Sequence, residues 1–151
     1  NQQIWIGTDE GIALFTCPQD IFDPSTLCRV SDRITNTFDQ FTEYLFETDA
    51  VTAIEVDGAN RKWLGTEGGG VFLVSDDGLE QIYNFNISNS PLISNSITAI
   101  TINEESGEVF FGTDKGIISF MGEVISYICF FIFYYTFSYS FYIIIKVLFS
   151  F

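Results

Sequence analysis

Short segments of alternating apolar and polar residues follow one another from Val51 to Phe85, separated by turns rich in Gly, Asp and Asn. The alternation over Val51–Asp57 is close to the period of two that a half-buried strand requires. Further strands are predicted over Lys62–Thr66, Val71–Ser75 and Glu80–Phe85. Four short antiparallel strands joined by tight turns make one blade of a β-propeller, so this segment predicts one blade.

One motif occurs three times: an aromatic residue, an apolar residue, Gly-Thr, a short turn that begins with an acidic residue, and a second Gly. Such recurrence is the sequence signature of a repeat architecture. The repeated positions are Trp5, Gly7, Thr8 and Gly11, then Trp63, Gly65, Thr66 and Gly70, and finally Phe110, Gly112, Thr113 and Gly116. We expect the aromatic rings to pack between neighbouring blades. The glycine of each Gly-Thr pair is expected where another part of the backbone approaches closely.

The repeats predict an all-β fold, a fragment of a β-propeller with about two and a half blades over residues 1–50, 51–96 and 97–122. The first blade is longer than the roughly 40 to 50 residues of a propeller repeat, which indicates an insertion over residues 16–41. After this insertion, Thr42–Glu47 is expected to form the fourth strand of the first blade. Closed propellers need roughly four to eight blades, so we expect the chain to be a fragment.

Residues 123–151 differ in composition from the rest of the chain, and Val124–Ile145 carries no charge. As a helix, this segment would be about 33 Å long, enough to cross a bilayer core of roughly 30 Å. Its Phe, Tyr and Ile content favours strands instead. The same residue types are those that AT-rich codons encode. Three interpretations stay open: a non-native tail from a frameshift or read-through, a membrane segment, or folded strands.

The charge balance argues against one class of partner. The sequence has 20 acidic residues against six basic ones, and its formal net charge is −14. Nucleic-acid binding depends on clustered Lys and Arg residues, and the sequence has no basic patch. No nucleic-acid partner is therefore expected, and the acidity is expected to keep an exposed sheet protein in solution.

The residue types that carry most enzyme chemistry are scarce. The sequence has no histidine, which removes the commonest general acid–base and the usual metal ligand. Asp76-Asp77-Gly78 lacks the spaced acids and the distal Glu of a calcium loop. The carboxylate pairs Glu104–Glu105 and Glu47–Asp49 lie in polar, turn-like stretches and are expected to be solvated. We therefore predict no catalytic residue, no cofactor and no metal ligand, and we expect a protein that is not an enzyme.

Cys17 and Cys28 form the only close pair of cysteines. In an oxidising compartment they could form a disulfide that holds the insertion together, at a typical gain of about 2–4 kcal/mol. The alternative is two small, partly buried thiols. A zinc site is not predicted because two further ligands are missing.

Two strings carry a resemblance to a known family: VDGANRKW over residues 56–63 and GEVFFGTDKG over residues 107–116. The repeats resemble the two-component-regulator-type propeller repeats of Bacteroidetes proteins. Within that group, Val51–Phe120 resembles the last propeller blades of PorZ-like proteins of the type IX secretion system. The resemblance covers about residues 1–122.

The resemblance implies a non-enzymatic binding and assembly module at the cell surface or outer membrane, in the attachment complex that links secreted cargo to lipopolysaccharide. Implied partners are other attachment-complex proteins and lipopolysaccharide, with membrane contact only if the tail is native. The family has a C-terminal β-sandwich secretion signal, and we expect the tail to stand in its place in this chain. No ligand residue is transferred, because the acidic balance does not suit an anionic sugar.

Two alternatives belong to other functional classes. One is the periplasmic ligand-sensing propeller of a hybrid two-component regulator, with a membrane helix over residues 124–145. The other is an enzyme propeller, such as a lyase or glycoside hydrolase, which the absence of histidine and of clustered catalytic acids disfavours.

Overall fold

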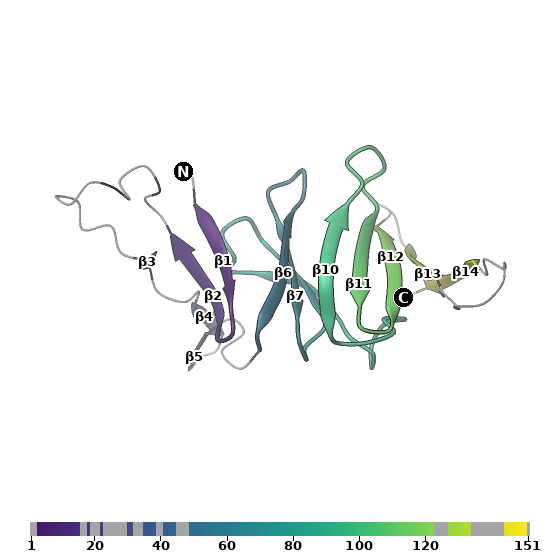
Figure 1. Cartoon of the computed structure of the whole chain (residues 1–151), viewed down its shortest axis with the longest axis horizontal. Coiled ribbons are helices and arrows are strands. Elements are labelled where there is room, and N and C mark those ends of the chain that lie inside the picture. The colour runs from purple at the N-terminus through teal and green to yellow at the C-terminus, as the bar shows by residue number, and fades with distance from the viewer. Residues whose placement is uncertain are drawn as a thin grey trace.

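The computed structural model describes residues 3–15, 18, 22, 30–31, 35–38, 41–44, 49–122, 127–133 and 144–150. Side chains are described for residues 3–15, 18, 22 and 49–122. Within these ranges the regular structure is built of antiparallel strands (Figure 1). No helix in the described part of the chain is long and apolar enough to cross a membrane.

The four strands at the centre of Figure 1 form one sheet in sequence order. They are β6 (Val51–Val56), β7 (Lys62–Thr66), β8 (Val71–Val74) and β9 (Gln81–Phe85). Each pairs antiparallel with the next, through turns at Asp57–Arg61, Glu67–Gly70 and Ser75–Glu80. The observed strands differ from the predicted ones by no more than one residue at either end. The prediction of a propeller-type blade is confirmed.

We number the large sheets along the chain: the sheet nearest the N-terminus is the first, the four-stranded sheet just described is the second, and the third has five strands. They are β10 (Ile97–Ile102), β11 (Val109–Thr113), β12 (Gly116–Gly122), β13 (Tyr127–Phe133) and β14 (Ile144–Ser150). The first three repeat the pattern of β6, β7 and β8. The last two come from the tail and pair onto β12 and onto each other.

The membrane helix considered over residues 124–145 is not found in the described part of that range, where Tyr127–Phe133 is a strand. Aromatic and β-branched residues favour extended backbone. The free edge of β12 offers them unpaired backbone groups. The interpretation of residues 123–151 as a non-native tail stays a prediction.

The N-terminal strands form two smaller sheets. One contains β1 (Ile4–Thr8), β2 (Gly11–Phe15) and β3 (Val30–Ser31), and the other contains β4 (Thr35–Phe38) and β5 (Phe41–Tyr44). The expectation that Thr42–Glu47 forms the fourth strand of the first blade is wrong, because β5 pairs with β4. A hairpin between neighbouring segments closes a much shorter loop than a return to the first sheet. Cys17 and Cys28 lie outside the described residues.

The sheets lie side by side, with the first strands of successive sheets adjacent (Figure 1). Strand β6 contacts β1 on one side and β10 on the other. Two apolar clusters fill the spaces between sheets. The smaller contains buried Ile12, Val51, Leu64 and Val74, and the larger is built around Trp63, Phe85, Phe111 and Phe120.

Gly7 and Gly65 of the repeated motif allow this close approach. A Cβ built on Gly65 would lie 2.5 Å from Ile97 Cγ2 in the next sheet. A Cβ on Gly7 would lie 2.7 Å from the carbonyl oxygen of Val51. Beside Gly65, Thr52 Oγ1 lies 2.6 Å from the carbonyl oxygen of Ile97, within hydrogen-bond distance. A side chain at the motif glycine would push the neighbouring sheet away.

A threonine closes the same turn in every copy of the motif. Its hydroxyl donates to the carbonyl of the second motif glycine, at 3.0 Å for Thr8 to Gly11, 3.1 Å for Thr66 to Gly70 and 2.9 Å for Thr113 to Gly116. The same hydroxyls accept from the backbone N–H of Glu10, Gly69 and Lys115. The second glycine has positive φ in all three turns, a conformation that other residues rarely adopt. The threonine and the second glycine of the motif therefore close the turn between its two strands.

Gly65→Ala is expected to lower the free energy of unfolding by about 1–3 kcal/mol, because the new methyl group overpacks against Ile97. The measurement is urea unfolding followed by circular dichroism. Gly58→Ala is the matched control, since a Cβ there meets nothing within 4 Å. Equal stability of the two variants would show that the motif glycine is not a packing requirement.

Thr66→Val is expected to cost about 1–3 kcal/mol, because the buried turn loses its hydroxyl and the N–H of Gly69 loses its acceptor. Thr101→Val, at an exposed position on β10, should change stability by less than about 0.5 kcal/mol. Both are measured by urea unfolding. A Thr66 variant as stable as the Thr101 variant would contradict the turn-closing role.

Candidate functional site

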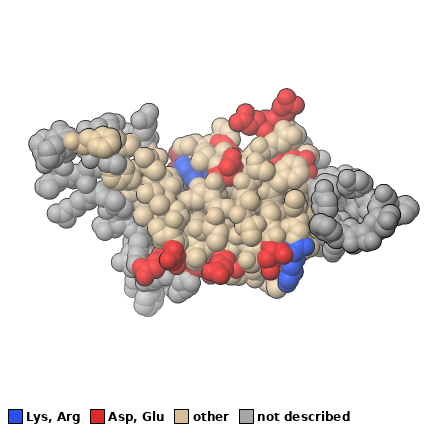
Figure 2. Space-filling view, viewed as in Figure 1, with Lys and Arg blue, Asp and Glu red and all other residues tan. Residues whose placement is uncertain are grey.

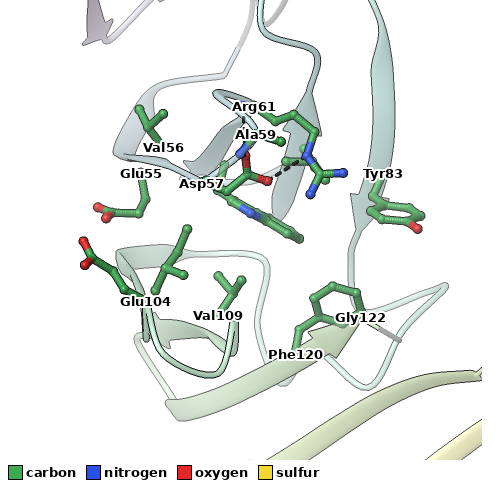
Figure 3. A pocket seen from close by; sticks show the side chains of 15 residues that line it. Glu55, Val56, Asp57, Ala59, Arg61, Tyr83, Glu104, Val109, Phe120 and Gly122 are labelled. Carbon is green, nitrogen blue, oxygen red and sulfur yellow. Dashed lines mark hydrogen bonds and ion pairs between the residues drawn. The ribbon is translucent and has the colours of Figure 1, made fainter. Parts of the chain in front are cut away.

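A pocket of about 930 Å³ lies between the β6–β9 sheet and strands β10–β12 (Figure 3). Its volume falls within the range of roughly 300–1,000 Å³ that small-molecule sites occupy. The second sheet contributes Glu55, Asp57, Arg61, Trp63, Leu73 and Tyr83, and the third contributes Ile102, Glu104, Val109 and Phe120. The pocket opens beside the β6–β7 and β10–β11 turns, at the end of the sheets away from the Gly-Thr turns.

Aromatic rings form one wall of the pocket. Trp63 is 3% exposed, and its ring centroid lies 5.5 Å from that of Phe111 and 5.7 Å from that of Phe120. The ring centroid of Tyr83 lies 5.4 Å from that of Phe85 and 6.2 Å from that of Phe120. Tyr83 nevertheless remains 39% exposed. Buried rings thus hold an accessible Tyr83 ring in a fixed position at the rim.

An ion pair shapes the β6–β7 turn above these rings. Arg61 Nε donates to Asp57 Oδ2 at 2.7 Å. The other carboxylate oxygen of Asp57 accepts the backbone N–H groups of Ala59 and Arg61, each at 2.9 Å. The Asp57 carboxylate is thereby held in the turn, while 42% of the Arg61 side chain stays exposed. In Figure 3 the guanidinium lies between Asp57 and Tyr83.

Two further carboxylates lie on the opposite side of the pocket from Tyr83 (Figure 3). Glu55 is half-buried near the end of β6, and Glu104 is exposed in the β10–β11 turn. Neither forms an ion pair with a basic side chain in the described part of the chain. The pocket therefore carries three carboxylates against one guanidinium, and its potential is negative.

Lys62 lies on β7 at the contact with the first sheet, and it is 4% exposed. Its ammonium donates to the carbonyl oxygens of Asn60 at 2.7 Å and Asp76 at 2.6 Å. It also lies 4.9 Å from the ring centroid of Trp5, within the range of a cation–π contact. Burial lowers the pKa of Lys62, while the charges of Asp76, Asp57 and Asp77 act in the opposite direction. Lys62 and Trp5 together join the first two sheets.

The pKa of Lys62 predicts a pH dependence. Between its lowered pKa in the folded state and the ordinary value of 10.5, the unfolded chain binds more protons than the folded protein. Stability contributed by this group therefore rises as pH increases through that interval. Urea unfolding between pH 7 and 10 should show this rise in the chain but not in Lys62→Met. Lys115→Met, at an exposed position, should keep it, and identical slopes in both variants would contradict the assignment.

The repeat residues that the sequence analysis singled out lie in several parts of the structure. Trp63 lies on the pocket wall, Trp5 lies at the first inter-sheet contact, and Phe110 is half-buried on β11. Gly7 and Gly65 lie at inter-sheet contacts, whereas a Cβ on Gly112 would meet only Thr98 and Ala99 of its own sheet. The motif threonines and second glycines lie in the β1–β2, β7–β8 and β11–β12 turns. The described residues contain no group of three or more His, Cys, Asp or Glu side chains that could hold a metal ion.

Sequence reasoning did not find the pocket. Glu104 was expected to be a solvated turn residue, and no role was predicted for Glu55, Arg61 or Tyr83. One feature of β9 pointed toward the pocket: Tyr83 and Phe85 are two residues apart, so both rings lie on the same face of the strand. The pairing of that face with the β10–β11 turn appears only in the folded molecule.

No protein-family model matches the chain, and no curated protein matches its sequence. Among solved structures, it is similar to PorZ, a bacterial surface component of the type IX secretion system of Porphyromonas gingivalis. The TM-score is 0.72 and the identity 30%, over 78% of this chain and 16% of PorZ. It is also similar to the extracellular domain of a protein described as a hybrid two-component system from B. thetaiotaomicron. There the TM-score is 0.55 and the identity 27%, over 81% of this chain and 14% of that one.

These likenesses agree with the propeller architecture and confirm the resemblance to PorZ-like proteins that the motifs indicated. The neighbours are a surface component and an extracellular domain. The chain spans about one sixth or less of either solved structure.

Proposed function

We propose that this chain is part of a non-enzymatic binding and assembly module of a type IX secretion system, in the attachment complex that links secreted cargo to lipopolysaccharide. The observation that carries the proposal is the similarity to PorZ, with a TM-score of 0.72 and 30% identity over 78% of this chain. We further propose that the protein works at the cell surface or outer membrane.

The chemistry of the pocket supports a binding role rather than catalysis. Asp57 is held by Arg61 and by two backbone N–H groups, so its carboxylate is already occupied. The sequence has no histidine to pair with a nucleophile. Glu104 is exposed to solvent, and the pocket offers it no histidine as a partner for proton transfer.

The charge distribution bears on which partners this segment contacts. On the face shown in Figure 2, acidic side chains gather at both ends of the sheets and few basic side chains are visible. An anionic lipopolysaccharide would be repelled by these ends. We therefore propose that the described sheets contact protein partners in the attachment complex, and that lipopolysaccharide is bound elsewhere in the assembly.

A second candidate is the periplasmic ligand-sensing propeller of a hybrid two-component regulator. It is supported by 27% identity to the extracellular domain from B. thetaiotaomicron over 81% of this chain, with a TM-score of 0.55. A preformed pocket with a negative potential is compatible with sensing a small ligand. The lower structural similarity makes this the second choice.

Deletion of the gene in the bacterium that encodes it distinguishes the two functions. Under the first proposal, secreted cargo should lose its attachment to the cell surface and appear in the medium. Complementation by the Gly58→Ala gene should restore attachment, whereas the destabilised Gly65→Ala gene should restore it less. Unchanged attachment together with altered transcription of a particular gene cluster would contradict the first function and favour the sensor.

A further inference from the structure

We propose that the pocket between the second and third sheets binds a primary ammonium group on an aliphatic stem, presented by a lysine side chain of a partner protein. The occupant is inferred from the charge and shape of the pocket alone. The inference goes beyond both functions above, because it assigns a ligand chemistry that holds for either.

The charges of the pocket call for a cation. Arg61 and Asp57 compensate each other through the 2.7 Å contact between Nε and Oδ2. This leaves Glu55 and Glu104, which reach the pocket from neighbouring sheets and have no ion-pair partner within the described residues. A cation placed beside them gains two favourable charge interactions, whereas an anion meets two repulsive ones.

The other side of the pocket suits an aliphatic stem. Trp63, Leu73, Val109 and Phe120 are each between 1% and 4% exposed, so this lining is apolar and closely packed. Methylene groups lying against it would leave water, as the stem of a lysine does when its ammonium stays at a polar rim.

Other ligand classes fit less well. A neutral apolar molecule would exclude water from Glu55 and Glu104 without replacing their hydration. A divalent metal would need more closely grouped carboxylates, and the described residues contain no group of three or more candidate ligands. A partner lysine can bring its stem to the apolar lining while its ammonium meets the carboxylates.

Isothermal titration calorimetry on the full chain tests the chemistry with three probes of equal length: pentylamine, 1-pentanol and pentanoate. We expect pentylamine to bind at least about tenfold more tightly than pentanol, and pentanoate to show no binding. The affinity for pentylamine should fall as salt concentration rises, because the interaction is electrostatic. Equal binding of amine and alcohol, or no binding of the amine, would overturn the inference.

Neutral variants test the location. Glu55→Gln and Glu104→Gln should each weaken pentylamine binding about five- to tenfold. Glu105→Gln is the matched control, because Glu105 lies in the same turn, is exposed and does not line the pocket. The control should bind as the unchanged chain does. The same loss in all three variants would reveal a general effect of net charge and would overturn the assignment to this pocket.

A peptide tests the source of the ammonium. An acetylated Gly-Lys-Gly amide should bind at least as tightly as pentylamine, and acetylation of its lysine Nε should abolish binding. A peptide that binds more than about tenfold more weakly than the free amine would overturn the assignment to a partner protein. None of these outcomes affects the deletion phenotype, so failure here is distinguishable from failure of the proposed function.

Discussion

The contact between the second and third sheets is the constraint on which the described structure depends. Trp63 on β7 packs against Phe111 and Phe120 of the next sheet, with ring centroids 5.5 and 5.7 Å apart. This packing requires the sheets to lie close together, and Gly65 allows it because a Cβ there would collide with Ile97. Trp63 and Gly65 are two residues apart on β7, and the large ring of one and the missing side chain of the other both serve the same contact between sheets. Burial of the rings stabilises the contact that the glycine makes possible.

The pocket is a consequence of the same contact. The rings that join the sheets also form its apolar wall, so the wall is as rigid as the core itself. At its polar end, the turns between strands are fixed by their own hydrogen bonds, among them those that Asp57 accepts from Ala59 and Arg61. Binding groups held by a packed scaffold need little reordering when a ligand arrives. A preformed pocket at the junction of two repeats thus follows from the way the repeats pack against each other.

Local signals made much of the fold predictable. The alternation over β6 to β9 and the turn residues between these strands gave their bounds to within one residue, because each signal acts over a few neighbouring residues. One wrong prediction and one open alternative concern longer-range choices. Phe41–Tyr44 could pair with the first sheet or with β4, and the tail could form a helix or extend β12. In both cases the neighbouring edge, which sequence pattern does not specify, decided the pairing.

By itself, the sequence determined the repeat, the strand positions, the Gly-Thr turns and the resemblance to PorZ-like proteins. Each of these depends on short stretches of neighbouring residues. Only the tertiary structure decided what Thr66 bonds to, that Lys62 contacts Trp5, and that Glu55 and Glu104 share one pocket. The two glutamates are far apart along the chain and belong to different sheets. Their proximity depends on how one repeat packs against the next, and that packing is a property of the folded arrangement rather than of either segment.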